Sequence, residues 1–163
     1  MSVAPAVSQV APPAADCPLC REDGGRLIAR HARFRVIRVT GPDADDFPGF
    51  YRVVWNSHVA EWSDLPEPDQ VLCMRAVSVV ERAVREHLQP TKVNLAALGN
   101  VVPHLHWHVV ARYGWDSRFP APLWAPASRP ADAARLAELR ERLPACDAAL
   151  AASLAAAFTD PSI

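Results

Sequence analysis

Three histidines at alternate positions in the segment PHLHWHVVAR constrain this chain more than any other feature. His104, His106 and His108 are separated by single apolar residues, and two valines follow the last of them. Because side chains of a β-strand point alternately to opposite faces, we expect the three imidazoles on one face and the apolar residues on the other. Three buried imidazoles without partners would each cost about 1 to 3 kcal/mol. The histidine face should therefore open into a polar cleft or a metal site.

A single histidine in a strand is most often a partly exposed side chain with an ordinary hydrogen bond. Three in strict alternation are different, because buried faces of strands favour aliphatic residues. A row of imidazoles can coordinate a metal, donate to anionic oxygens, or supply a nucleophile or proton shuttle near neutral pH. The pattern therefore indicates chemistry in this segment and leaves open which of these it is.

Size and charge exclude several classes of protein. The 163 residues, 50% of them hydrophobic, suffice for one globular domain with a real core. A formal net charge of −1 lacks the excess of basic residues that proteins use to bind nucleic acid or an anionic membrane. No segment reaches the roughly 20 apolar residues of a membrane-spanning helix, and residues 1–16 lack the pattern of a secretory signal. We expect a disordered tail over 1–16 and a cytoplasmic protein.

The rest of the chain predicts an antiparallel sheet. Runs of β-branched and aromatic residues predict strands, the last two joined by a tight turn at Gly99 and Asn100, which requires antiparallel pairing. The expected strands are 26–30, 34–39, 50–56, 92–98 and 103–112.

Two segments have the period of a helix. Apolar residues recur at three- and four-residue steps over 68–88, and an alanine-rich segment begins near residue 131, with an interruption expected at Pro144. We therefore predict an α+β fold in which about five antiparallel strands are covered by one long helix, with a C-terminal helical extension.

The segment HLHWHVV resembles the His-x-His-x-His-x-x pattern of the histidine triad family of nucleotide hydrolases and transferases. The upstream segment PGFYRVVWNSHVAEWSDL and the turn GNVVPHLHWH are similar to family segments in the same order, as is CPLC near the start. The resemblance spans about residues 17–112. It implies the fold predicted above and a nucleotide site at the histidines.

The resemblance also assigns roles to single residues. His106 would be the nucleophile that attacks an α-phosphorus and forms a nucleotidyl-histidine intermediate, which water then hydrolyses. His108 would donate to the phosphate and favour departure of the leaving group as an imidazolium. Asn100 and Asn94 would contact phosphate oxygens through their amides, and His104 would be a supporting or metal-binding residue.

The chain departs from the family pattern near the triad. Asn100 stands where the family usually has Gln, and Val101 where many members have a Ser or Thr that contacts phosphate. One phosphate donor of the usual set is therefore missing from the sequence. The departures concern the substrate and the rate more than the fold.

Cys17 and Cys20 form a Cys-x-x-Cys pair, which by itself is equally typical of two free thiols on a turn. Zinc in a closed site takes four ligands and favours thiolate with imidazole. The zinc-carrying relatives suggest His58 and His104 as the other two ligands. The resemblance thus implies a structural zinc ion that holds His104 out of the chemistry.

These observations predict a histidine triad domain over 17–125 and a helical extension over 126–163. The expected function is an enzyme that hydrolyses a nucleoside phosphoanhydride or phosphoramidate, such as a dinucleoside polyphosphate. A nucleotide-binding module with little catalysis and a zinc-binding structural protein remain alternatives. The expected partners are a nucleotide and, by the resemblance, a second copy of the chain in a homodimer, without nucleic acid or membrane.

Overall fold

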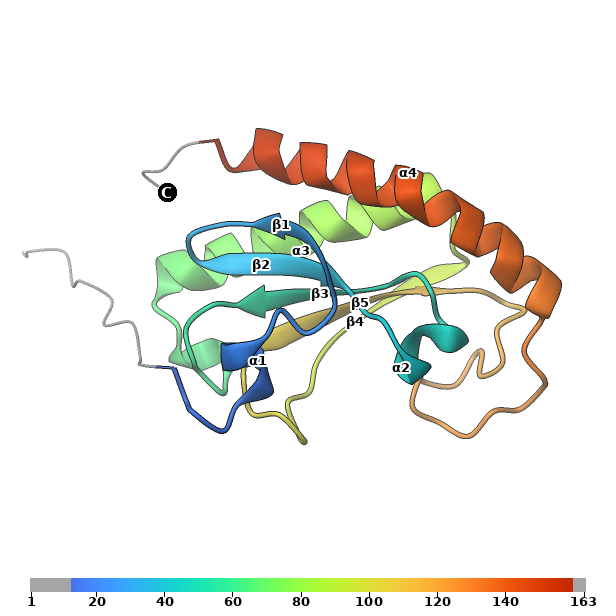
Figure 1. The fold of residues 1–163 in the computed structure, drawn as a ribbon, viewed down its shortest axis with the longest axis horizontal. Coiled ribbons are helices and arrows are strands. Elements are labelled where there is room, and N and C mark those ends of the chain that lie inside the picture. The colour runs from blue at the N-terminus through green and yellow to red at the C-terminus, as the bar shows by residue number, and fades with distance from the viewer. Residues whose placement is uncertain (1–12, 160–163) are drawn as a thin grey trace, which may run out of the picture.

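The computed structural model describes residues 13–159 of the chain. Its centre is one five-stranded sheet in the order β1-β2-β3-β5-β4, in which every neighbouring pair is antiparallel (Figure 1). The tail predicted over 1–16 lies outside the described residues except for its last four. The strands are β1 (Arg26–Arg30), β2 (Phe34–Arg38), β3 (Phe50–Trp55), β4 (Lys92–Ala97) and β5 (His106–Arg112).

Two long helices cover one face of the sheet. The helix α3 (Glu67–Leu88) contacts β3, β4 and β5, whereas α4 (Ala133–Ala157) contacts α3 and β1 (Figure 1). The helix α3 confirms the predicted period. It ends at Leu88, and the next residue, Gln89, has a left-handed backbone (φ 50°) and precedes Pro90. Together they confirm the predicted α+β fold with its C-terminal helix.

Three short helices complete the part of the fold that residues 13–159 form. The helices α1 and α2 lie on the opposite side of the sheet from α3 and α4 (Figure 1). The short helices are α1 (Pro18–Arg21), α2 (Pro42–Asp45) and the 3-10 helix η1 (Trp62–Asp64).

The expected interruption at Pro144 was wrong, because α4 continues through this residue. Proline in a helix interior costs about 3 kcal/mol through a lost hydrogen bond and a steric clash. Here the buried residues Leu139, Leu143 and Cys146 pack into the main core on both sides of it. Asp147 adds polar contacts, since it accepts hydrogen bonds from Tyr51 Oη at 2.8 Å and Arg38 Nε at 3.2 Å. Tertiary packing therefore outweighs the local break.

The prediction of a tight turn at Gly99 and Asn100 was also wrong, because β4 ends at Ala97 and β5 begins only at His106. The predicted strand start at Pro103 was therefore too early. The antiparallel pairing of β4 with β5 is confirmed, but residues 98–105 form a longer connection. In this connection Leu105 pairs with residues outside β4: its N–H donates to Val59 O at 2.7 Å, and its carbonyl accepts from Trp55 N–H at 3.1 Å. His104 thereby lies ahead of the strand.

Strand alternation places the two remaining triad histidines on the face away from the long helices. On β5, Val109 and Ala111 belong to the main core with α3, whereas His106 and His108 alternate with them. On β3, Arg52 takes the same side as the histidines. The sheet therefore has an apolar face under the long helices, and its opposite face carries Arg52, His106 and His108.

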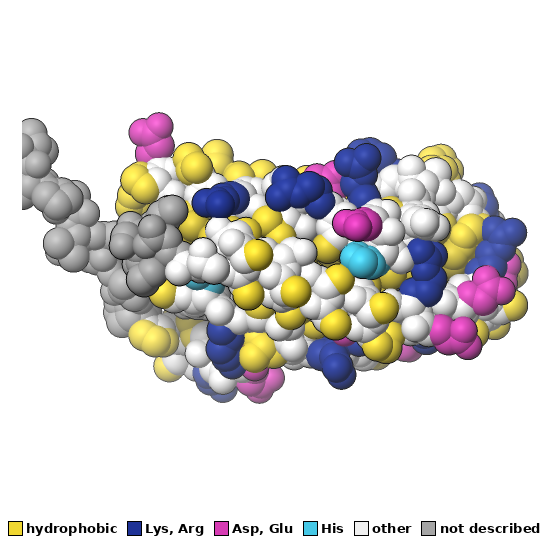
Figure 2. Space-filling view, turned by 90° about the horizontal axis from the view of Figure 1, so that it is seen from above, with side chains coloured by type: hydrophobic (Ala, Val, Ile, Leu, Met, Phe, Trp, Pro, Cys, Tyr) yellow, Lys and Arg dark blue, Asp and Glu magenta, His cyan; other side chains and the backbone are white. Residues whose placement is uncertain are grey.

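Within residues 13–159, none of the helices combines the length and apolar character that a membrane span requires. Figure 2 looks onto the side that carries the two long helices and shows acidic, basic and hydrophobic side chains interspersed there. This face has no large patch of a single charge.

Candidate active site and metal site

His106 has one ring nitrogen bound to the backbone. Its Nδ1 lies 2.6 Å from the carbonyl oxygen of His104, and a carbonyl can only accept, so Nδ1 carries the proton. In a neutral imidazole the other nitrogen, Nε2, then has the lone pair. Burial, with only 8% of the residue exposed, lowers the pKa of His106 and favours this neutral form. The arrangement makes Nε2 a nucleophile or an acceptor.

His108 has a buried ring whose nitrogens lack hydrogen-bond partners within residues 13–159. Only 4% of it is exposed, and neither ring nitrogen has a hydrogen-bond partner among the described residues. Its ring lies between aromatic neighbours, with centroid distances of 4.8 Å to His106, 5.2 Å to Trp124 and 5.3 Å to Phe50. Burial, followed by the positive charges of nearby groups, lowers the pKa of His108 to about 3. A buried polar ring without partners is a position where a ligand would supply them.

Two cavities meet at His108 and Trp124. The first, of about 590 Å³, brings His106 and His108 together with Arg52 and the loop residues 98–102, which include Asn100. The second, of about 560 Å³, is lined by Asn94, Lys92 and the other side of His108. The two asparagines predicted to bind substrate lie in different cavities: Asn100 lies in the cavity of His106, and Asn94 lies in the cavity on the other side of His108.

Asn94 is oriented by a buried arginine. Arg112 Nη1 donates to Asn94 Oδ1 at 2.7 Å, so the amide NH2 of Asn94 is the group that can donate to a ligand. Arg112 also pairs with Asp116 at 2.9 Å, and both residues are almost fully buried. Asp116 in turn accepts from the backbone N–H groups of Tyr113, Arg118 and Phe119. This network fixes the loop that carries Trp124.

Sequence reasoning missed Arg52 and Asp116. Arg52 interrupts the apolar run FYRVVW, which was a signal, but its position opposite His108 depends on the β3–β5 register. Asp116 lies only four residues after Arg112, yet nothing in the sequence showed that both are buried.

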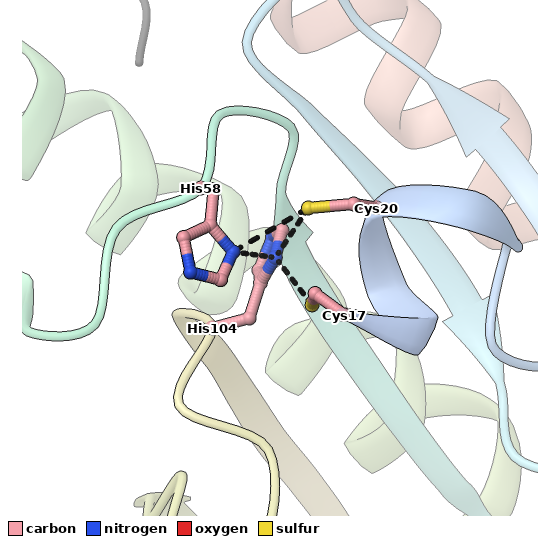
Figure 3. A group of neighbouring side chains, drawn as sticks. All are labelled: Cys17, Cys20, His58 and His104. Atoms are coloured by element: carbon pink, nitrogen blue, oxygen red, sulfur yellow. Dashed lines mark hydrogen bonds between the residues drawn. The ribbon is translucent and has the colours of Figure 1, made fainter. Parts of the chain in front are cut away.

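The third histidine, His104, does not line the 590 Å³ cavity that contains His106 and His108. His104 lies in the connection before β5 and not in the strand, but its ring stays on the same side of the sheet as His106: its Nδ1 faces Cys17, which belongs to one buried cluster with Val54, the partner of His106. His104 Nε2 lies 2.6 Å from the Trp55 carbonyl and must donate to it, which leaves the lone pair on Nδ1. That lone pair points to Cys17, Cys20 and His58 (Figure 3).

These four side chains form a compact group from three parts of the chain (Figure 3). The cysteines come from α1 and the residue before it, His58 from the loop after β3, and His104 from the loop before β5. The potential ligand atoms all lie within 4.8 Å of one another, so the group could hold a metal ion.

The spacing within the group fits tetrahedral coordination. His104 Nδ1 lies 3.4 Å from Cys17 Sγ, 3.5 Å from Cys20 Sγ and 3.3 Å from His58 Nδ1. Ligands at about 2.0 to 2.3 Å from a tetrahedral zinc ion would be roughly 3.3 to 3.8 Å apart. One lone pair cannot accept hydrogen bonds from three donors, whereas a shared metal ion accounts for all three approaches. The donor set and its geometry therefore fit zinc.

A buried arginine holds the cysteine segment against the sheet. Arg35 Nη2 donates to Leu19 O at 2.7 Å and Glu22 O at 3.0 Å, and its Nε donates to Asp23 O at 3.1 Å. Only 5% of Arg35 is exposed. The position of the cysteines is thus set partly by protein contacts.

The comparison with known families identifies the domain. The HIT domain family model matches residues 27–114, which include all five strands except the first residue of β1, the helix α3 and the triad. This is more than half of the chain. The chain belongs to the HIT domain family. The recognition of the histidine triad from its sequence pattern is thereby confirmed.

Known HIT proteins resemble the chain in sequence and structure. An AP-4-A phosphorylase of Mycobacterium tuberculosis is 30% identical over 115 residues, which cover 67% of this chain and 57% of that protein. A histidine triad protein of Bradyrhizobium japonicum is 29% identical with a TM-score of 0.58, covering 74% of this chain and 91% of its own. One from Marinobacter aquaeolei is 25% identical with a TM-score of 0.59, covering 78% and 92%.

The low pKa of His108 predicts a loss of stability in mild acid. At His108, the unfolded chain binds a proton below pH 6.5 that the folded chain does not take up until about pH 3. The free energy of unfolding therefore decreases as the pH is lowered through this window. We expect His108→Asn to remove about 2 kcal/mol of the decrease between pH 7 and pH 5. Urea unfolding at the two pH values measures it.

The matched control is His87→Asn, on the half-buried last turn of α3. It should leave the acid dependence close to that of the native chain. An equal dependence in the native chain and His108→Asn would show that His108 titrates normally.

Proposed function

We propose that the protein is an enzyme that cleaves a nucleoside phosphoanhydride or phosphoramidate at the α-phosphate. The observation that carries the proposal is the hydrogen bond from His106 Nδ1 to the His104 carbonyl, which leaves the Nε2 lone pair beside the unpartnered His108 in one cavity. The similarity to AP-4-A phosphorylase supports a phosphoanhydride of this kind. The chain spans only 57% of that relative's length, so the substrate is part of the proposal.

In the first step, His106 Nε2 attacks the α-phosphorus, forming an N–P bond while the bond to the leaving group breaks and its electron pair departs with that group. The phosphorylated imidazole gains positive charge, which the 2.6 Å hydrogen bond from Nδ1 to the carbonyl stabilises. Water then attacks phosphorus, the N–P bond breaks, and the electron pair returns to Nε2. The water proton leaves through the product or the solvent.

His108 supplies the donor for the phosphoryl oxygens. In the free site its pKa is about 3, so it enters the reaction as a neutral imidazole with one N–H. An anionic phosphate against the ring favours the charged form and raises this pKa. Substrate binding thus brings His108 toward the imidazolium that the family resemblance assigns to it.

The name of the relative also favours a second acceptor. A phosphorylase transfers a group to phosphate, and the same nucleotidyl-histidine intermediate can react with inorganic phosphate in place of water. Assays with and without inorganic phosphate distinguish the two products.

We also propose that Cys17, Cys20, His58 and His104 hold one structural zinc ion. With four protein ligands the site is closed, so the metal would tie α1 to the sheet and supply no open coordination position. His104 would fix the loop whose carbonyl binds His106. No step of the reaction passes through the metal.

The remaining proposals concern assembly and location. We infer a triad domain over 17–125 with an extension over 126–163, a cytoplasmic location, and no nucleic-acid or membrane partner. Leu95 on the edge strand β4 and Leu98 just after it are exposed by 39% and 48%, whereas α4 contacts the other edge strand, β1. Pairing of two β4 edges would cover these residues in a homodimer.

His106→Ala tests the enzyme. With diadenosine tetraphosphate, or with adenosine 5′-phosphoramidate, the native chain should turn over and the variant should lose at least about 1,000-fold in kcat, because the nucleophile is absent. Rapid acid quench with labelled substrate should trap an adenylated native chain and no adenylated variant.

Equal rates in both chains would rule out His106 as the nucleophile. Nucleotide binding by calorimetry without turnover would support the binding module, which the exposed Val101 in place of a phosphate donor favours. The absence of both turnover and binding would reject a nucleotide site.

Cys17→Ser tests the metal site. Elemental analysis should find one zinc per native chain and strongly reduced zinc in the variant, because one of four ligands is lost. His106→Ala is the control and should keep its zinc. Retention of zinc by Cys17→Ser, or zinc loss in His106→Ala, would contradict the proposed ligand set.

A further inference from the structure

We propose that Arg52 binds the phosphate chain of the substrate and makes the site select anionic polyphosphate leaving groups over amine leaving groups. The inference rests on the proposed function and names its substrate class. The geometry that carries it is the position of the Arg52 guanidinium on the neighbouring strand, where Arg52 is the direct partner of His108 and lines the cavity of His106.

The register of the sheet places Arg52 beside the reacting groups. Arg52 on β3 is the partner of His108 on β5, and Val54 is the partner of His106. Directly opposed residues in an antiparallel pair have Cβ atoms about 4.5 to 5.5 Å apart on the same face. The arginine therefore occupies the same face as both histidines and lines their 590 Å³ cavity.

The cavity otherwise lacks charge. Among the described residues that line it, Arg52 is the one with a permanently ionised side chain; the others are apolar residues, glycines, Asn100, Trp124 and the two histidines. A phosphate chain carries several negative charges, so the permanent charge supplies the main electrostatic attraction in the site.

Phe50 supports the guanidinium in this position. The Arg52 Cζ atom lies 5.1 Å from the Phe50 ring centroid, and the same ring contacts His108 at 5.3 Å. A planar guanidinium over an aromatic face keeps its N–H groups at the edge, where they can bind two oxygens of one phosphate. One aromatic side chain thus orders both the arginine and the histidine.

Arg52 also compensates for a missing donor. In the family pattern that the sequence resembles, a hydroxyl that would contact phosphate often stands at the position of Val101, which is 93% exposed. The hydroxyl is a neutral donor, whereas a guanidinium brings charge to the same cavity. The exchange changes which leaving groups the site favours.

The selectivity follows from what each leaving group needs. An amine must receive a proton to depart, and Arg52 in the same cavity opposes by charge repulsion the protonation of His108 that phosphate binding favours. A polyphosphate departs as an anion and needs positive charge close to its oxygens. Arg52 provides that charge and opposes protonation of His108, so both effects favour the phosphoanhydride.

The test compares kcat/KM for diadenosine tetraphosphate and adenosine 5′-phosphoramidate in the native chain, Arg52→Met and Arg52→Lys. We expect Arg52→Met to lose about 100-fold with the tetraphosphate, as when one donor to a developing charge is removed. The phosphoramidate rate should change by less than about 3-fold. Arg52→Lys should recover part of the tetraphosphate rate, because it restores charge without the planar fork.

Arg82→Met is the matched control, since it removes an equal charge from an exposed position on α3, across the sheet from the cavity. It should leave both rates unchanged. Equal losses on both substrates in Arg52→Met, or no loss on either, would overturn the inference. So would a native preference for the phosphoramidate.

Calorimetry with diadenosine tetraphosphate separates this inference from the proposed reaction. If the native chain binds the tetraphosphate without turnover, the proposed reaction fails, while weaker binding by Arg52→Met still supports the arginine's role. Equal binding by the native chain and Arg52→Met overturns that role. No binding by either chain overturns both proposals.

Discussion

Two short hydrogen bonds to backbone carbonyls set the chemical character of the whole site. His104 Nε2 donates to Trp55 O, and His106 Nδ1 donates to His104 O, each at 2.6 Å. The two rings are thereby held in opposite tautomers. His104 directs its lone pair to the cysteines and His58, and His106 directs its lone pair away from the carbonyl. Under the proposed function, the ring of His104 would bind the metal ion while its backbone carbonyl orients His106, the proposed nucleophile.

The fold protects this arrangement from both sides. On one side, α3 and α4 bury the apolar face of the strands, which includes Val109, the residue after His108 on β5. On the opposite side, Arg35 holds the cysteine segment, and the Arg112–Asp116 pair holds the loop with Trp124. Arg35 does so through hydrogen bonds to backbone carbonyls, and the Arg112–Asp116 pair is buried, where a salt bridge adds little net stability compared with apolar packing.

The sequence predicted what depends on periodicity and little of what depends on contacts between distant segments. Alternation placed His106 and His108 on one face, and the helical period identified α3, because both are local properties of the chain. The connection 98–105 and the continuous helix through Pro144 were mispredicted because long-range contacts override local turn and proline signals there. Arg52 was missed because its role depends on the register with β5.

The His104 carbonyl fixes the tautomer of His106 and leaves Nε2 unprotonated. Long-range proton–nitrogen NMR of the histidine rings, in chain labelled with nitrogen-15 and assigned with His106→Ala, measures this directly at neutral pH. We expect His106 to be protonated on Nδ1 alone, with the nitrogen shift of Nε2 in the range of an unprotonated imidazole. A proton on Nε2, or rapid exchange between the two tautomers, would contradict it.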